Sequence, residues 1–147
     1  MATYRDAGVN ISEAARLVNR IRDDAENTGG PQARGEIGAF GAFYEVPKAE
    51  QPVLVSSTDG VGTKLEPALA AGSYRAIGRD CVAMCANDIL CHGAKPLFFL
   101  DYLACGKLDA DIAAEIVLGM SRACAEIGCV LSGGETAEMP GFYAEGT

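Results

Sequence analysis

Three short clusters of polar residues and glycine carry the side chains that could do chemistry in this chain of 147 residues. The first cluster reads SSTDGVGTK, from Ser56 to Lys64, and its candidate ligand-binding residues are Asp59, Gly60, Gly62, Thr63 and Lys64. Its glycines let backbone N–H groups face a ligand oxygen, and its lysine brings a positive charge for phosphate. The Asp59 carboxylate is a hard oxygen ligand suited to Mg²⁺. The spacing matches neither a Walker A loop nor a dinucleotide fingerprint, so an ordinary glycine turn is the alternative.

The second cluster, Asn87-Asp88, interrupts an apolar helical pattern. Asp88 follows Met84 by four residues, which predicts that it lies on the buried side of the helix. A carboxylate at such a place must be paired, protonated or bound to metal. The alternative is an aspartate that bonds a neighbouring backbone group. Asp101 raises the same question, because it is a lone carboxylate in the apolar run PLFFLDYLA.

The third cluster, SGGETAEMP from Ser132 to Pro140, follows a predicted strand. Glu135 could join Asp59 and Asp88 around a cation, and the adjacent glycines Gly133 and Gly134 allow a ligand to approach the backbone. Several carboxylates, glycine turns and one lysine favour Mg²⁺-nucleotide binding over acyl transfer. The single histidine, His92, offers no Ser-His-Asp or Cys-His set, and we interpret it as structural.

The six cysteines lie in apolar periodic runs, and no Cys-x-x-Cys pair occurs. We therefore expect buried, reduced thiols rather than disulfides or a metal centre. A metal site built on Cys91-His92 is the alternative, but it needs more ligands than this spacing readily supplies. The cysteines are Cys81, Cys85, Cys91, Cys105, Cys124 and Cys129.

Length and charge limit the possible classes of protein. A chain of 147 residues with 49% hydrophobic side chains can bury one core without disulfides. With 12 basic and 20 acidic residues the net charge is −8, which argues against nucleic acid or an anionic membrane as a partner. The N-terminus lacks the apolar core of a signal peptide, and no run reaches the 18 apolar residues of a membrane span. These features indicate a cytoplasmic protein.

The first half of the chain predicts one helix, a loop and two strands. Asn10 caps a helix that extends to Ala25, with Glu13 in the capping-box position. Residues 1–36 thus comprise this helix and a flexible glycine-rich loop. The loop-like sequence itself runs from residue 26 to residue 38. The segments 40–46 and 52–58 are β-branched and aromatic, so we expect two antiparallel strands.

The second half predicts alternating helices and strands. A helix over 77–92 ends near Gly93, and a second is capped by Asp109 and ends at Gly128. The strand over 96–104 reads as buried on both faces, and 129–132 forms a last short strand. We therefore expect an α/β fold with a mixed four-stranded sheet and helices on one face. The open apolar face predicts a homodimer joined sheet to sheet, or else a covering domain.

Motifs in sequence order resemble the phosphoribosylformylglycinamidine cyclo-ligase family, the aminoimidazole ribonucleotide synthetases. The strings are DAGVN, TDGVGTKL, AMCANDILCHGAKPLFFLDYLACGKL and SGGETAEMPGFY, spanning Tyr4 to Tyr143. The resemblance implies an enzyme of purine biosynthesis that uses ATP and Mg²⁺ to close the imidazole ring of formylglycinamidine ribonucleotide. It also implies that residues 1–147 are an N-terminal, ATP-contacting and dimer-forming domain without its C-terminal domain, so that the fragment alone is inactive.

The resemblance assigns roles by position. Catalytic roles fall on Asp59, Lys64, Asn87, Asp88 and Asp101, and metal ligation on Asp59, Asp88 and Glu135. Nucleotide contacts fall on Gly41, Asp59, Gly60, Gly62, Thr63, Lys64, Asp88, Asp101, Gly133, Gly134, Glu135 and Thr136. The chain departs from the family at RIRDDAENTGGPQARG, which is acidic where the family is rich in lysine and arginine.

Other classes are alternatives to this assignment. Thiamine monophosphate kinase, selenophosphate synthetase and the hydrogenase maturation dehydratase share a similar ATP-using framework, but PLFFLDY and GGETAEMPG favour the cyclo-ligase. A noncatalytic dimerisation module, whose glycine loops are only turns, is the alternative outside catalysis.

Overall fold

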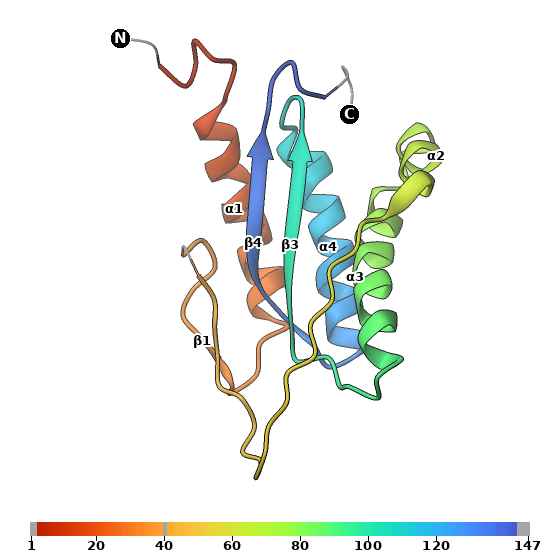
Figure 1. Cartoon of the computed structure of the whole chain (residues 1–147). Coiled ribbons are helices and arrows are strands. Elements are labelled where there is room, and N and C mark those ends of the chain that lie inside the picture. Colours follow the sequence, from red (N-terminus) through yellow and green to blue (C-terminus); the bar gives the residue numbers. More distant parts are fainter. Residues whose placement is uncertain (1–2, 40, 144–147) are drawn as a thin grey trace.

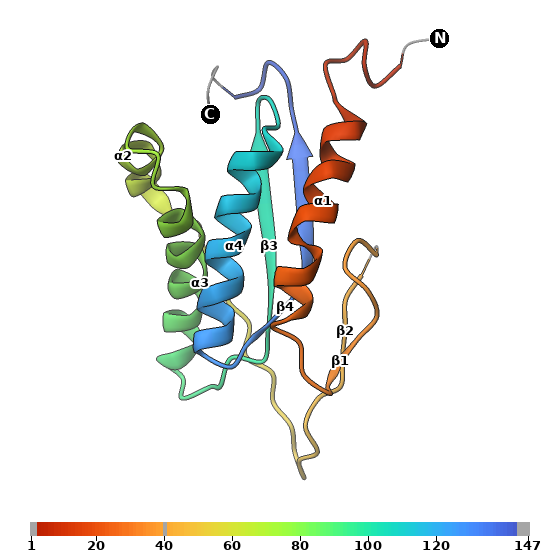
Figure 2. The same cartoon turned by 180° about the vertical axis from the view of Figure 1, so that it is seen from behind.

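Three long helices lie on one side of a parallel pair of strands, and the helix α4 lies between α1 and α3 (Figures 1 and 2). The computed structural model describes residues 3–39 and 41–143. The elements in chain order are α1 (Ile11–Glu26), β1 (Ala33–Arg34), β2 (Phe43–Tyr44), a 3₁₀ helix η1 (Gly62–Lys64), α2 (Leu65–Ala70), α3 (Tyr74–Leu90), β3 (Phe98–Cys105), α4 (Ala110–Glu126) and β4 (Val130–Glu138). Among the described residues, no helix is both long and apolar enough to cross a membrane.

The predicted start of α1 is confirmed, but only half of the capping box forms. The Asn10 side chain accepts a hydrogen bond from the Glu13 backbone N–H. The Glu13 carboxylate does not return to Asn10; it accepts from the Ala110 backbone N–H at 2.9 Å. The Asn10 N–H instead donates to Glu138, whose other carboxylate oxygen accepts from Leu108. Two glutamates therefore fix the starts of α1 and α4 beside the end of β4.

Glycine allows α3 and α4 to approach closely. A Cβ atom added to Gly78 on α3 would overlap the backbone carbonyl of Ile116 and lie 2.8 Å from the backbone N of Met120. A Cβ atom on Gly119 of α4 would overlap the Arg75 carbonyl in the same way. The two helices therefore pack backbone to backbone, which fixes the position of α3 relative to α4. The predicted ends of these helices at Gly93 and Gly128 are confirmed, since both glycines have positive φ.

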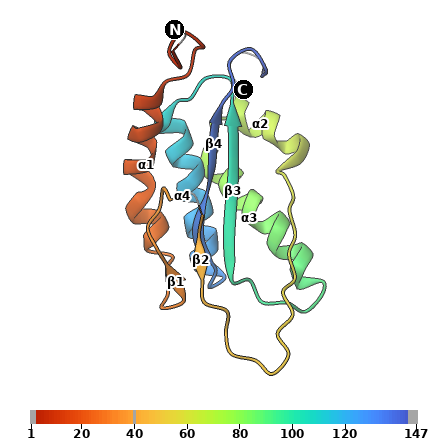
Figure 3. The same cartoon turned by 60° about the vertical axis from the view of Figure 1, so that its left-hand side comes forward.

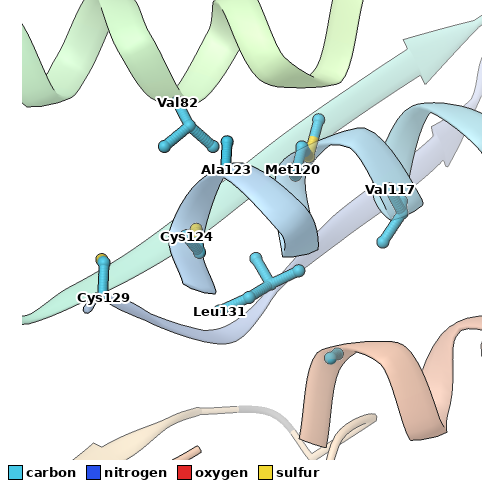
Figure 4. Close-up of a cluster of buried hydrophobic side chains, with 8 residues drawn as sticks. Val82, Val117, Met120, Ala123, Cys124, Cys129 and Leu131 are labelled. Atoms are coloured by element: carbon cyan, nitrogen blue, oxygen red, sulfur yellow. The ribbon is translucent and has the colours of Figure 1, made fainter. Parts of the chain in front are cut away.

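The core fills the space between the helices and the β3–β4 pair (Figure 4). β3 and β4 pair in parallel, with Phe98 opposite Val130 and Cys105 opposite Glu138. One register shift between Phe99 and Leu100 leaves Ser132 as an extra residue in β4. The main cluster of buried residues comprises Ala25, Val82, Val117, Met120, Ala123, Cys124, Cys129 and Leu131.

The predicted single sheet of four strands is wrong in its strand pairing. Among the described residues there are two separate two-stranded sheets, an antiparallel β1–β2 and a parallel β3–β4. β2 pairs with β1 and not with residues 52–58. β1 itself lies inside the segment 26–38, which we predicted as a loop. The segment 52–58 belongs to no strand, and Val53 is 84% exposed. Its β-branched residues favour an extended backbone, but that preference does not select a partner. Phe40, at the start of the predicted strand, lies outside the described residues.

The strand β3 is buried on one face only, so the prediction of burial on both faces is wrong. Its exposure alternates along the strand, with Leu100 at 54% and Tyr102 at 62%, while Phe99 and Leu103 pack on the core. The helices cover one side of the β3–β4 pair, and its other side is open (Figure 3). The apolar run therefore reflects a solvent-facing hydrophobic surface in the single chain.

Candidate functional site

The segment Ser57–Lys64 lies along the side of α3. The Ser57 hydroxyl donates to the Asp88 carboxylate at 2.7 Å, and the Cys85 thiol donates to the backbone oxygen of Asp59 at 3.7 Å. The Lys64 ammonium lies 3.2 Å from the carboxylate of Asp80. These α3 residues are separated by one or two helical turns, so the segment runs antiparallel to the helix (Figure 1). The first predicted cluster and Asp88 of the second therefore meet on one surface.

The glycine cluster forms a turn that exposes its polar groups. The Asp59 carboxylate accepts from the Gly60 N–H at 2.7 Å, and Gly62, with φ of 76°, begins η1. This positive φ is the backbone conformation that favours glycine there. Lys64 and Asp80 are both nearly half exposed, so their ion pair contributes at most about 1 kcal/mol. Lys64 is therefore available to an anion that enters the turn.

Asn87 and Asp88 are exposed, which corrects the prediction that Asp88 lies on the buried side of α3. The buried residues of that helix are Ile77, Gly78 and Val82. The buried face of α3 is rotated by about one residue from the predicted face. The prediction counted Cys81, Met84 and Cys85 as buried, and these side chains are only partly buried. Asp88 therefore lies at the surface, beside Ser57, where a cation can reach it.

Asp101 lies on the core face of β3, between Phe99 and Leu103. Its carboxylate covers Gly134 on β4, where an added Cβ atom would overlap it. Desolvation by burial raises the pKa of Asp101 to about 6, and its own backbone N–H only partly offsets this. Asp101 borders the same groove as Asp59, so the structure brings these two predicted residues to one cavity.

The residues Gly133, Gly134, Glu135 and Thr136 belong to β4, which continues to Glu138 instead of ending at Ser132 as predicted. Glu135 pairs with Tyr102, on the face of the β3–β4 pair opposite to Asp101. Glu135 is therefore not brought together with Asp59 and Asp88. Among residues 3–39 and 41–143, no group of three or more His, Cys, Asp or Glu side chains is placed to hold one metal ion. Gly41 is exposed between β1 and β2, away from the groove.

An open groove is lined by the segment 53–61, by β3 and by residues of α3. Its lining is mostly apolar and includes Val55, Phe98 and Leu100, and its carboxylates are Glu13, Asp59, Asp101, Asp109 and Asp111. The donor set suits Mg²⁺ held by one or two carboxylates together with phosphate oxygens and water, as that ion usually is in nucleotide sites. Asp59 in this groove and Asp88 in a smaller hollow, which shares Val55 and Ser57 with the groove, are the carboxylates of the segment and of α3 that could ligate it.

The thiols give no support to a cysteine-based site. Cys124 and Cys129 are buried as expected, but Cys91 is exposed, because α3 ends one residue before it. Burial raises the pKa of Cys81 to about 11, so this thiol is protonated at neutral pH. The thiol of Cys124 donates to Cys129, which lowers the pKa of Cys129 and raises that of Cys124. All six cysteines are free.

Sequence reasoning missed Asp80 at this surface, and it gave no role to Ser57, which belongs to the first predicted cluster. Asp80 precedes Met84 by four residues and Asp88 by eight, so helical spacing alone could have placed it on the same face. Ser57 gave no such signal, because only the folded segment shows which helical residue lies beside it.

The similar proteins described here all have the same enzyme name. A phosphoribosylformylglycinamidine cyclo-ligase of Clostridium tetani is 60% identical over 146 residues, and that of Clostridium botulinum strain Loch Maree is 56% identical. The enzyme of that name from Clostridium acetobutylicum is 55% identical over 147 residues. The matches cover 99% of this chain and 44% of each relative. Residues 38–146 match the family model described as AIR synthase related protein, N-terminal domain. The chain therefore belongs to the AIR synthase related protein family, and the part that matches is the N-terminal domain of that family.

Proposed function

We propose that this chain is the N-terminal part of an ATP-dependent cyclo-ligase that acts in the cytoplasm and closes formylglycinamidine ribonucleotide to aminoimidazole ribonucleotide. The observation that carries the proposal is the 55–60% identity, over 99% of the chain, to relatives named as that cyclo-ligase. The glycine turn beside exposed carboxylates is consistent with it, because such turns cradle phosphates.

The proposed reaction transfers the terminal phosphoryl group of ATP to the formyl amide oxygen of the substrate. The ring nitrogen then attacks the same carbon, the carbon–oxygen bond breaks with phosphate as the leaving group, and the nitrogen loses its proton. In this reaction the protein chiefly aligns the two substrates and stabilises negative charge. Lys64 and the backbone N–H groups of the turn, Gly60 and Gly62 among them, are suited to that role.

We assign the phosphate contacts to the turn from Asp59 to Lys64 and the Mg²⁺ contacts to Asp59 and Asp88. Mg²⁺ bound there would neutralise the triphosphate. Asn87 lies next to Asp88 on the exposed surface and would donate its amide to the nucleotide. Asp101, on the core face of β3, would act from the groove that it shares with Asp59.

We also propose that two copies associate through the open side of the β3–β4 pair. Leu100 and Tyr102 expose more than half of their surface there, and Leu54 beside the groove is 62% exposed. Exposed apolar side chains that gather on one face often mark a site of association. A symmetric dimer that faces these surfaces toward each other would remove them from water.

The test of this proposal is ring closure by the complete gene product that contains residues 1–147. Incubation with formylglycinamidine ribonucleotide and Mg-ATP should yield one ADP, one phosphate and one aminoimidazole product per turnover. The variant Asp59→Asn should form the product at least tenfold more slowly than the unaltered enzyme. Residues 1–147 alone should form dimers in sedimentation experiments without turnover. Release of no aminoimidazole by the complete product would reject the proposed activity.

A further inference from the structure

A serine of the first polar cluster, to which the sequence analysis assigned no role, makes the shortest side-chain contact between the glycine-turn segment and α3. The Ser57 hydroxyl donates to Oδ2 of Asp88 at 2.7 Å, across 31 positions of sequence. An ionised carboxylate only accepts, so the hydroxyl proton must point at Asp88. Hydrogen bonds of this charge-assisted kind are about twice as strong as neutral ones.

The bond leaves one carboxylate oxygen of Asp88 free. Among the described residues, Oδ1 of Asp88 has no hydrogen-bond partner, and the side chain is exposed. Ser57 is itself half-buried, whereas its neighbour Ser56 is exposed. The hydrogen bond from this half-buried serine limits rotation of the surface carboxylate of Asp88.

A second, weaker contact joins the same segment to α3. Lys64 forms a half-exposed ion pair with Asp80, two turns before Asp88, and exposed pairs of this kind contribute little to stability. Asp59 lies between these two contacts, and its backbone oxygen accepts from the Cys85 thiol. The Ser57 hydrogen bond is therefore the shortest contact that ties the Asp88 carboxylate to the segment that carries Asp59.

We propose that Ser57 is a positioning residue that orients the Asp88 carboxylate for a divalent cation. This inference rests on the proposed function, in which Asp88 is a metal ligand. Mg²⁺ requires near-octahedral geometry, so rotation of one carboxylate weakens its binding. Partners that orient a metal ligand typically change metal affinity by about 10-fold to 100-fold.

The experiment is a Mn²⁺ titration of residues 1–147, in which free Mn²⁺ is measured by electron paramagnetic resonance. Thr and Val have the same shape and differ in the hydroxyl, so Ser57→Thr and Ser57→Val form a matched pair. Ser57→Val should bind Mn²⁺ about tenfold more weakly than Ser57→Thr. The control Ser56→Ala should leave the affinity unchanged. Melting temperatures of the two Ser57 variants should agree, which separates positioning from general destabilisation.

Three results would overturn the inference, and each has a different meaning. Equal Mn²⁺ affinity of Ser57→Thr and Ser57→Val, with Asp88→Asn much weaker, rejects the positioning role and leaves Asp88 as a ligand. Unchanged affinity in Asp88→Asn rejects both the positioning role and this metal assignment. Absence of Mn²⁺ binding by the unaltered chain, with and without ATP, also rejects both. None of the three tests ring closure itself, which is measured separately on the complete gene product.

Discussion

Replacement of Asp101 by asparagine should stabilise the folded chain at neutral pH. Burial raises the pKa of Asp101 from 3.8 to about 6, so between these pH values the folded chain holds this proton more tightly than the unfolded chain. The contribution of Asp101 to stability therefore falls as pH rises from about 4 to 6 and stays low above pH 6. At about 1.4 kcal/mol for each tenfold change in proton affinity, the loss amounts to about 3 kcal/mol.

An asparagine amide in place of this carboxyl group would carry no charge at any of these pH values. Urea unfolding should therefore show Asp101→Asn equal to the unaltered chain near pH 4 and about 1–3 kcal/mol more stable at pH 7.5. The exposed Glu50→Gln is the control and should change stability by less than about 0.5 kcal/mol at both pH values. An asparagine variant that is less stable than the unaltered chain at pH 7.5 would refute the assignment of a destabilising buried charge. Loss of Mg-ATP binding together with increased stability would identify Asp101 as a functional residue.

Three further predictions concern packing, thiol chemistry and association. Gly78→Ala should destabilise the chain by more than about 2 kcal/mol, because its methyl group would overlap the backbone of Ile116, whereas the exposed Ala83→Gly should cost about 1 kcal/mol in urea unfolding. A thiol-specific reagent at pH 7 should modify Cys91 first, since it is exposed, and Cys91→Ser should remove the fast phase. Leu100→Lys should convert dimer to monomer in sedimentation experiments with little change in melting temperature. A fast phase that persists, or a dimer that persists, would contradict the corresponding prediction.

The helices were predictable from sequence because their signals are local. Asn10 and Asp109 accept hydrogen bonds at the helix starts, and Gly93 and Gly128 end helices with positive φ, as their residue types predict. The one-sided placement of the helices also follows from the alternation of elements. The short helix α2 was not predicted, since six residues give too little periodicity.

Strand pairing was not predictable to the same degree, because it depends on contacts between distant residues. The segment 52–58 has residue types that favour an extended backbone, but it pairs with no strand. Ala33–Arg34, which shows no strand pattern in the sequence, pairs with Phe43–Tyr44. The glycines Gly133 and Gly134 read as the end of a strand, yet the parallel register with β3 carries β4 through them.

The candidate site shows the same division. The glycine turn and Asp88 could be identified from residue types, and the structure brings them together on α3. The exposure of Asp88 and the separation of Glu135 on the opposite face depend on the packing of α3 and on the register of β4. Neither is encoded in a local motif.

The most direct test of Mg²⁺-dependent nucleotide binding at the glycine turn is a calorimetric titration of residues 1–147 with ATP, with and without Mg²⁺. The account predicts saturable binding that requires Mg²⁺ and is lost in Asp59→Asn, while Ser56→Ala binds like the unaltered chain. ATP binding of equal affinity with and without Mg²⁺, or unchanged ATP binding by Asp59→Asn, would contradict the assigned site. Absence of any heat from a folded chain would instead favour a noncatalytic dimerisation module.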